Sequence, residues 1–150
     1  MRAINHAMTG AIIGLSVAAP VAIPLAFASH FAMDALPHEG NLKLSHKKNT
    51  VILAGDIALC FVLALIIFVV RPPYWWLAIV CAFLATSPDV MWFRQHKDNG
   101  QGKTPKPVSQ RHAIVRLHYN VQWFQQPIGI IVEVAWAIIT GLCLYFLLRS

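Results

Sequence analysis

Long apolar stretches alternate with short polar connections along this chain. The apolar stretches cover 3–36, 51–70, 74–93 and 128–148. Each of the last three is close to the ~20 residues that an α-helix needs to cross a bilayer. We therefore predict an all-α integral membrane protein, with three transmembrane helices at 51–70, 74–93 and 128–148. Residues 1–150 would form a single membrane domain.

The first apolar stretch is too long for one straight span, and two prolines lie near its middle. Pro20 and Pro24 both interrupt helical hydrogen bonding. We predict an N-terminal helical hairpin over 3–36, with helices at about 4–18 and 21–36. One span with a proline kink and a cleaved signal peptide are the alternatives. Only the hairpin returns the N-terminus to the side where the first stretch ends.

The first helix of this hairpin carries small residues on one face. Gly10 and Gly14 lie four positions apart, and such a spacing lets a partner helix approach closely in a membrane. If the two helices of the hairpin pair, His6 comes to lie beside Asp34.

Basic residues are unevenly distributed between the connections. Lys43, Lys47 and Lys48 follow the first stretch, and half of the 12 lysine and arginine residues lie in the loop 94–127. By the positive-inside rule both connections are cytoplasmic. The net charge of +6 suits anionic membrane lipids as partners, and no nucleic-acid-binding motif is visible.

The second half of the loop 94–127 has a helical pattern. Apolar residues recur at Ile114, Leu117 and Val121, which predicts an interfacial amphipathic helix. This helix could present His118 and Gln122 to buried acids, with Arg111 and Arg116 available for a phosphate. Simple anchoring to the membrane surface is an equally good explanation of the pattern.

Candidate chemistry begins with a His-x3-Asp-x3-His string at the end of the first stretch, formed by His30, Asp34 and His38. Ionisable groups at such a depth are costly and usually functional. Four of the six acidic residues lie inside apolar stretches, at similar distances from the cytoplasmic side. They are Asp34, Asp56, Asp89 and Glu133.

Four carboxylates at one level of a membrane need a cation, because an unpaired buried charge costs several kcal/mol. The spans hold no lysine or arginine at this depth, so histidine and metal ions remain. Imidazole together with carboxylate suits zinc, manganese or iron, and we favour zinc or manganese. The predicted metal ligands are His6, His30, Asp34, His38 and Asp89.

Other chemistry finds less support. The three cysteines, at 60, 81 and 143, are scattered singly and fit packing rather than a zinc ribbon. The sequence has no P-loop, no dinucleotide-binding glycine motif and no Gly-x-Ser-x-Gly, which argues against a nucleotide-binding enzyme or a serine hydrolase.

The string Ser29-His-Phe-Ala-Met-Asp34-Ala-Leu-Pro-His38, with His6 before it and Ser87-Pro-Asp89 after it, resembles small bacterial membrane proteins related to the LexA-binding, inner-membrane-associated metal-dependent hydrolase family. The resemblance covers most of the chain and implies a bacterial inner-membrane location. It carries functional roles over to His6, His30, Asp34 and Asp89. The segment around Arg116 would add His118 and Gln122, and a Gly-x3-Glu run would add Glu133. The His-Arg-Gly-x-Thr-His-Ser motif of the larger family members is absent here.

Together these features predict a membrane-embedded hydrolase with one or two divalent metal ions, acting on an ester or phosphoester, such as that of a lipid, at the cytoplasmic leaflet. Asp56 or Glu133 would be the general base, and His118 a further catalytic group. A non-enzymatic ion-binding or transport protein is the competing hypothesis, and a structural or regulatory membrane protein is the third.

Overall fold

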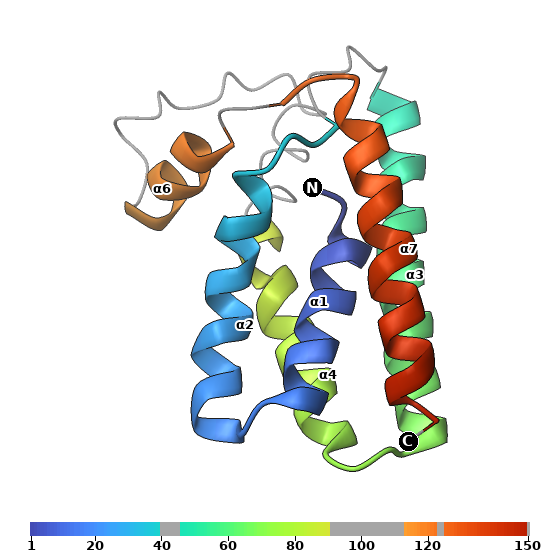
Figure 1. Ribbon diagram of the computed structural model, residues 1–150. Helices are drawn as coiled ribbons and strands as arrows, with labels where there is room; N and C mark the ends of the chain where they lie inside the picture. Colours follow the sequence, from blue (N-terminus) through green and yellow to red (C-terminus); the bar gives the residue numbers. More distant parts are fainter. Residues whose placement is uncertain (40–45, 91–112, 123–124, 150) are drawn as a thin grey trace.

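The computed structural model describes residues 1–39, 46–90, 113–122 and 125–149, and it is a bundle of helices (Figure 1). Arg111 and residues 91–93 of the predicted third span lie outside the described residues. In chain order the elements are α1 (Ala3–Ser16), α2 (Ala19–Asp34), α3 (His46–Val70), α4 (Trp75–Thr86), the 3-10 helix η1 (Ser87–Asp89), α6 (Ala113–Val121) and α7 (Gly129–Leu147).

Helices α1 and α2 lie side by side and run in opposite directions, joined by Val17 and Ala18 (Figure 1). Helix α2 begins two residues earlier than predicted. Pro20 lies in its first turn, where no backbone N–H is needed, and Pro24 is accommodated inside the helix. The prolines therefore do not set the start of α2, and a hairpin within the membrane stays a prediction.

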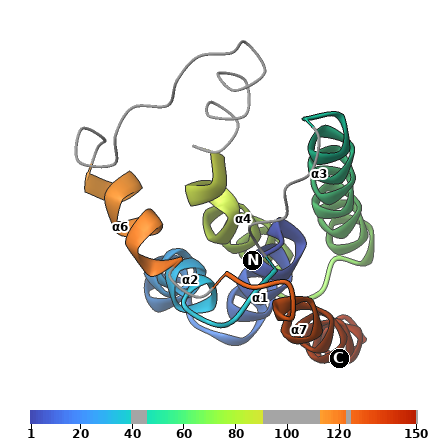
Figure 2. The same cartoon turned by 90° about the horizontal axis from the view of Figure 1, so that it is seen from above.

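Helix α1 occupies the centre of the bundle, with α2, α3, α4 and α7 around it (Figure 2). Its small face packs closest against α4. A Cβ atom added at Gly14 would lie 2.6 Å from Ala78 Cα and 2.7 Å from Leu77 O, and one at Gly10 would meet the backbone of Cys81. The glycines predicted to admit a partner helix therefore admit α4 more closely than α2.

Two helices of the described chain are long and apolar enough to cross a membrane, Lys47–Val70 and Gly129–Leu147. Only 11% and 17% of their most apolar 18-residue stretches are buried, so their large apolar side chains face outward and need an apolar environment. Helix α4 is shorter, because the chain passes into η1 at Ser87–Asp89. The third predicted span stays a prediction.

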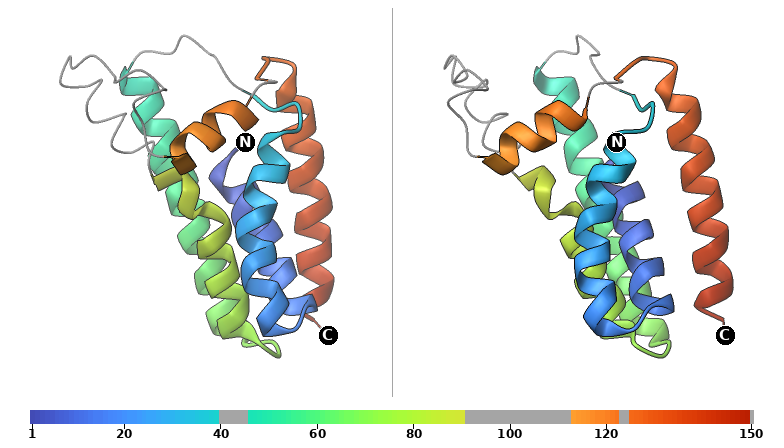
Figure 3. Two further views of the ribbon diagram at one scale, coloured as in Figure 1. Left: turned by 90° about the vertical axis from the view of Figure 1, so that its left-hand side faces the viewer. Right: turned by 60° about the vertical axis from the view of Figure 1, so that its left-hand side comes forward.

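Helix α6 lies across the end of the bundle where the N-terminus lies, at an angle to the long helices (Figure 3). It contacts α2. The segment that follows α6 in the chain is bonded to the segment that follows α2, since the backbone N–H of Gln126 donates to the carbonyl of His38. This arrangement places the amphipathic helix over the end of the bundle that holds the buried acids.

Candidate metal centre

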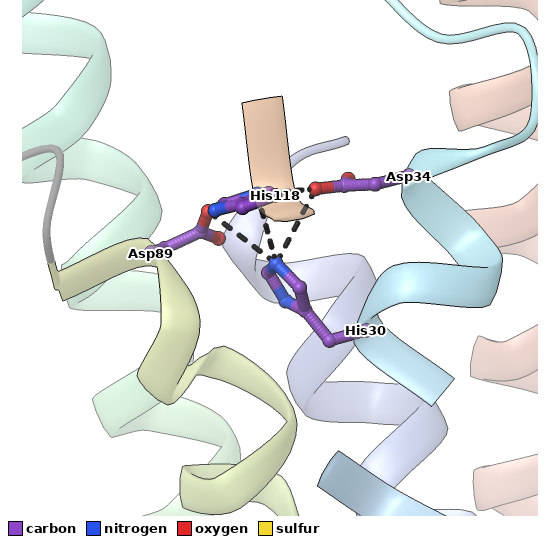
Figure 4. Close-up of side chains that lie close together, drawn as sticks. All are labelled: His30, Asp34, Asp89 and His118. Atoms are coloured by element: carbon purple, nitrogen blue, oxygen red, sulfur yellow. Dashed lines mark hydrogen bonds and ion pairs between the residues drawn. The ribbon is translucent and has the colours of Figure 1, made fainter. Parts of the chain in front are cut away.

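Four side chains from three separate elements converge at this end of the bundle (Figure 4). His30 and Asp34 lie one turn apart on α2, Asp89 ends η1, and His118 comes from α6. One ligand atom from each lies within 4.8 Å of the other three. His30, Asp34 and His118 are completely buried, whereas the side chain of Asp89 is 22% exposed.

The distances between these atoms suit a single small ion. His30 Nε2 lies 3.3 Å from Asp34 Oδ2 and 3.9 Å from Asp89 Oδ1. His118 Nε2 lies 2.7 Å from Asp34 Oδ2, 3.8 Å from Asp89 Oδ1 and 3.1 Å from His30 Nε2. Tetrahedral bonds of about 2.0–2.1 Å to zinc separate the ligand atoms by about 3.3–3.4 Å. The observed values scatter around this separation.

The tautomer of His30 makes a cation beside it favourable. His30 Nδ1 lies 2.8 Å from the carbonyl oxygen of Ala85, and a carbonyl can only accept, so Nδ1 carries a proton. In the neutral ring Nε2 then presents a lone pair to the carboxylate of Asp34, which is a repulsive contact. A proton on Nε2 or a metal ion between the groups removes the repulsion, and a histidine fixed through its other nitrogen is typical of metal ligands.

A second group of donors surrounds Asp34. The other oxygen, Oδ1, lies 3.2 Å from His6 Nε2 and accepts from the Met1 amino group at 2.7 Å. Gln122 Nε2 donates to Oδ2 at 3.0 Å. His6 also stacks on His30, with ring centroids 4.1 Å apart. His6 therefore lies behind Asp34 and orients it, outside the group of four.

Asp56 has a different environment from the one predicted for a metal-site base. Its two carboxylate oxygens accept from the backbone N–H groups of Ala3, at 2.7 Å, and Ile4, at 3.1 Å. These are the donors that the first turn of α1 leaves without an intrahelical partner. Asp56 thus caps α1 from α3, where a negative charge is also favoured by the helix dipole.

Glu133 likewise holds the N-terminal segment. Its carboxylate accepts from the backbone N–H groups of Arg2, at 3.3 Å, and Glu39, at 3.0 Å, and its backbone carbonyl accepts from Asn5 Nδ2. The Arg2 guanidinium lies 3.8 Å away and pairs with Glu39 as well. Glu133 therefore connects α7 to both chain segments that approach the candidate metal centre.

We expect the substitution Glu133→Gln to destabilise the fold by about 1–3 kcal/mol, since a buried donor loses its charged acceptor. Glu39→Gln is the matched control, because it removes only the partly exposed pair with Arg2 and should cost less than about 1 kcal/mol. The free energy of unfolding of both variants, measured in the same detergent, tests this. Equal effects would show that the Glu133 carboxylate is not a structural support.

His38 lies apart from the group of four. Its Nδ1 donates to the carbonyl of Leu36 at 2.8 Å, so Nε2 is left as an acceptor. That atom is buried and has no hydrogen-bond partner among the described residues. Burial lowers the pKa of His38, which keeps the ring neutral at pH 7.

A cavity of about 830 Å³ adjoins the candidate metal centre. Asp89, one of the four grouped residues, lines this cavity, and so does Gln122, which donates to Asp34. Asp56, Glu133 and His38 line it as well. The cavity lies between α3 and α4, with α1 behind it. A small molecule in this cavity can therefore reach the exposed side of Asp89.

The structure thus brings together His30, Asp34, Asp89 and His118, with His6 and Gln122 against Asp34. Arg116 is exposed on α6. Sequence reasoning missed the carbonyl of Ala85 and the Met1 amino group, because backbone groups carry no signal in side-chain patterns. The prediction of Asp89 as a ligand already brought the end of the 74–93 stretch to the site, but it did not indicate that a backbone carbonyl of α4 would hold His30.

Comparison with family models, with curated proteins and with solved structures finds no match to this chain.

Proposed function

We propose that His30, Asp34, Asp89 and His118 bind one divalent metal ion, and that the protein is a membrane-embedded hydrolase of an ester or phosphoester. The observation that carries this proposal is the position of Asp89, which belongs to the ligand group and to the wall of a large cavity. Structural zinc sites are closed, whereas catalytic sites keep a position open to substrate. This group is open on the side of Asp89.

A divalent ion bound here would lower the pKa of a coordinated water to about 7 and polarise the substrate oxygen. The protein's own groups hold the ligands in place. The carbonyl of Ala85 fixes His30, and His6 and Gln122 fix the two oxygens of Asp34. Because Asp56 and Glu133 already accept backbone N–H groups, Asp89 would be the group that accepts a proton from the attacking water, through the carboxylate oxygen that does not hold the ion.

The resemblance of the sequence motifs to those of metal-dependent hydrolases of the bacterial inner membrane supports the same function, and the basic connections favour the cytoplasmic leaflet for the site. The outward-facing apolar side chains of α3 and α7 suit lipid surroundings. A substrate would then enter from the membrane rather than from water.

Hydrolysis of fluorogenic lipid probes tests this function. The purified full chain in vesicles, loaded with zinc or manganese, should cleave an acyl-ester or a phosphodiester probe, lose the activity on chelation, and regain it when the ion is returned. His118→Ala should reduce the rate by at least about 100-fold, because His118 would be a direct ligand. Mutating a residue that only hydrogen-bonds to a metal ligand already reduces activity by up to about 100-fold. Asn120→Ala, an exposed position on the same helix, should keep the wild-type rate.

Absence of turnover of both probe types by metal-loaded protein would contradict the proposal. Metal-dependent ion flux across the same vesicles would replace it with the transport hypothesis.

A further inference from the structure

The cavity between α3 and α4 has two chemically different ends. Its polar residues gather at the end beside the candidate metal centre, among them Arg2, His38, Asp89 and Gln122. Farther along the helices the wall is apolar and includes Ala7, Ile57, Cys60, Ala64, Ile79 and Ala82. Such a division matches a molecule with a polar head and a hydrocarbon chain. The volume, about 830 Å³, lies within the range of roughly 300–1,000 Å³ usual for small-molecule sites.

The cavity also opens sideways between the helices. Phe61 of α3 and Phe83 of α4 line it, yet they are 72% and 66% exposed, so they form its rim. Helix α3 packs into the bundle mainly through Leu63 and Ile67, which are buried, whereas Val51 nearer its start is exposed. The half of α3 beside the polar end is therefore not closed against α4 by direct packing.

In a bilayer the apolar wall alone does not select an occupant, because lipid chains already surround every outward apolar surface. The polar end must provide the preference. His38 is 1% exposed and lines the cavity, and its Nε2 atom has no hydrogen-bond partner among the described residues. Since Nδ1 already donates to Leu36, Nε2 needs a donor, and a lipid hydroxyl can supply one.

We propose that this cavity binds a membrane lipid with a hydroxyl-bearing head, one acyl chain of which enters between Phe61 and Phe83 and lies along the apolar wall toward Ala64. The head then lies beside Asp89 and His38. That this lipid is the substrate rests on the proposed hydrolase function, whereas its binding does not require turnover.

Photolabelling tests the binding directly. The probe is phosphatidylglycerol with a diazirine on one acyl chain, in vesicles of phosphatidylethanolamine and phosphatidylglycerol that contain the full chain. Every residue of α1 before Ser16 is at least partly buried, so label near Ala7 reports a chain inside the bundle. We expect such label in the wild type and its loss in Ala64→Trp, in which the indole fills the apolar part of the cavity.

Ala58→Trp is the matched control, since Ala58 is an exposed alanine of α3 that does not line the cavity. It should keep the label at Ala7. The same probe built on phosphatidylcholine, whose head has no hydrogen-bond donor, should label Ala7 less. Circular dichroism and bound metal show that both variants are folded.

If Ala7 is not labelled in the wild type, or is still labelled in folded Ala64→Trp, the proposed lipid site is overturned. Equal labelling by the two head groups overturns the role given to His38. Neither result bears on metal-dependent hydrolysis, which the probes of the preceding subsection measure separately.

Discussion

Replacing Asp34 with asparagine is expected to abolish stoichiometric metal binding. Asp34 is the carboxylate of the group that lies closest to both histidine ligands, with Oδ2 at 2.7 Å from His118 Nε2 and 3.3 Å from His30 Nε2. An amide is a much weaker ligand than a carboxylate, and its NH₂ group would face one set of the surrounding donors. The affinity should fall by more than the ~100-fold that loss of an outer partner can cost.

The same substitution also affects the metal-free protein. Asp34 is completely buried and lies against His6 and the Met1 amino group. Removing one partner of a buried charged group typically costs about 3–5 kcal/mol. We therefore expect Asp34→Asn to lower the free energy of unfolding even after chelation.

Metal analysis of the purified protein, together with titration of zinc and manganese, measures this effect. Asp56→Asn is the matched control, because it makes the same chemical change at a carboxylate that caps α1 and lies outside the ligand group. It should keep one bound ion. Unchanged affinity in Asp34→Asn, or equal loss in the two variants, would contradict the assignment of the metal centre.

The second large effect is expected from the smallest side-chain change, Gly14→Ala. The added methyl group would lie 2.6 Å from Ala78 Cα, and because both atoms belong to or adjoin the backbone, the helices themselves must separate. Overpacking of this kind costs about 1–3 kcal/mol. Helix α4 also carries the Ala85 carbonyl that orients His30, so metal affinity should fall together with stability.

Gly55→Ala and Gly141→Ala are the controls for this prediction. A Cβ atom at either position meets nothing within 4 Å, and alanine is favoured over glycine inside a helix by about 1 kcal/mol. These two variants should therefore be slightly more stable than the wild type. Unfolding in denaturing detergent, followed by circular dichroism, gives the sign of each effect. A stabilised Gly14→Ala variant would show that α1 and α4 do not pack as described.

The buried acids show how far sequence reasoning reaches. Apolar patterning placed Asp34, Asp56, Asp89 and Glu133 at one end of the helices, and the structure places all four there. The contacts of these four carboxylates fall into two kinds, however. Asp34 and Asp89 face the histidines, whereas Asp56 and Glu133 accept backbone N–H groups of the N-terminal segment. Position along a helix follows from counting residues, but the direction a side chain faces depends on which helices pack together.

The histidines divide in the same way. His30 and Asp34 could be paired from their spacing, because residues four apart share a helix face. His38 shared the string but lies apart from the group, since its ring is held by Leu36 and its backbone by the segment before α7. His118, which lies 84 positions after Asp34 in the chain, belongs to the group because α6 brings it there. The amphipathic pattern of that segment allowed either a role at the site or simple anchoring to the membrane.

By itself the sequence determined that the chain is helical, that two of its helices are long and apolar enough to cross a membrane, and that carboxylates and histidines gather at one end. These properties depend on local composition and on distance along the chain. Only the tertiary structure decided that α4 packs on the glycines of α1, that α6 brings His118 to Asp34, and that a cavity opens beside Asp89. Those contacts join residues far apart in sequence, and they are set by the packing of whole helices, which no local pattern encodes.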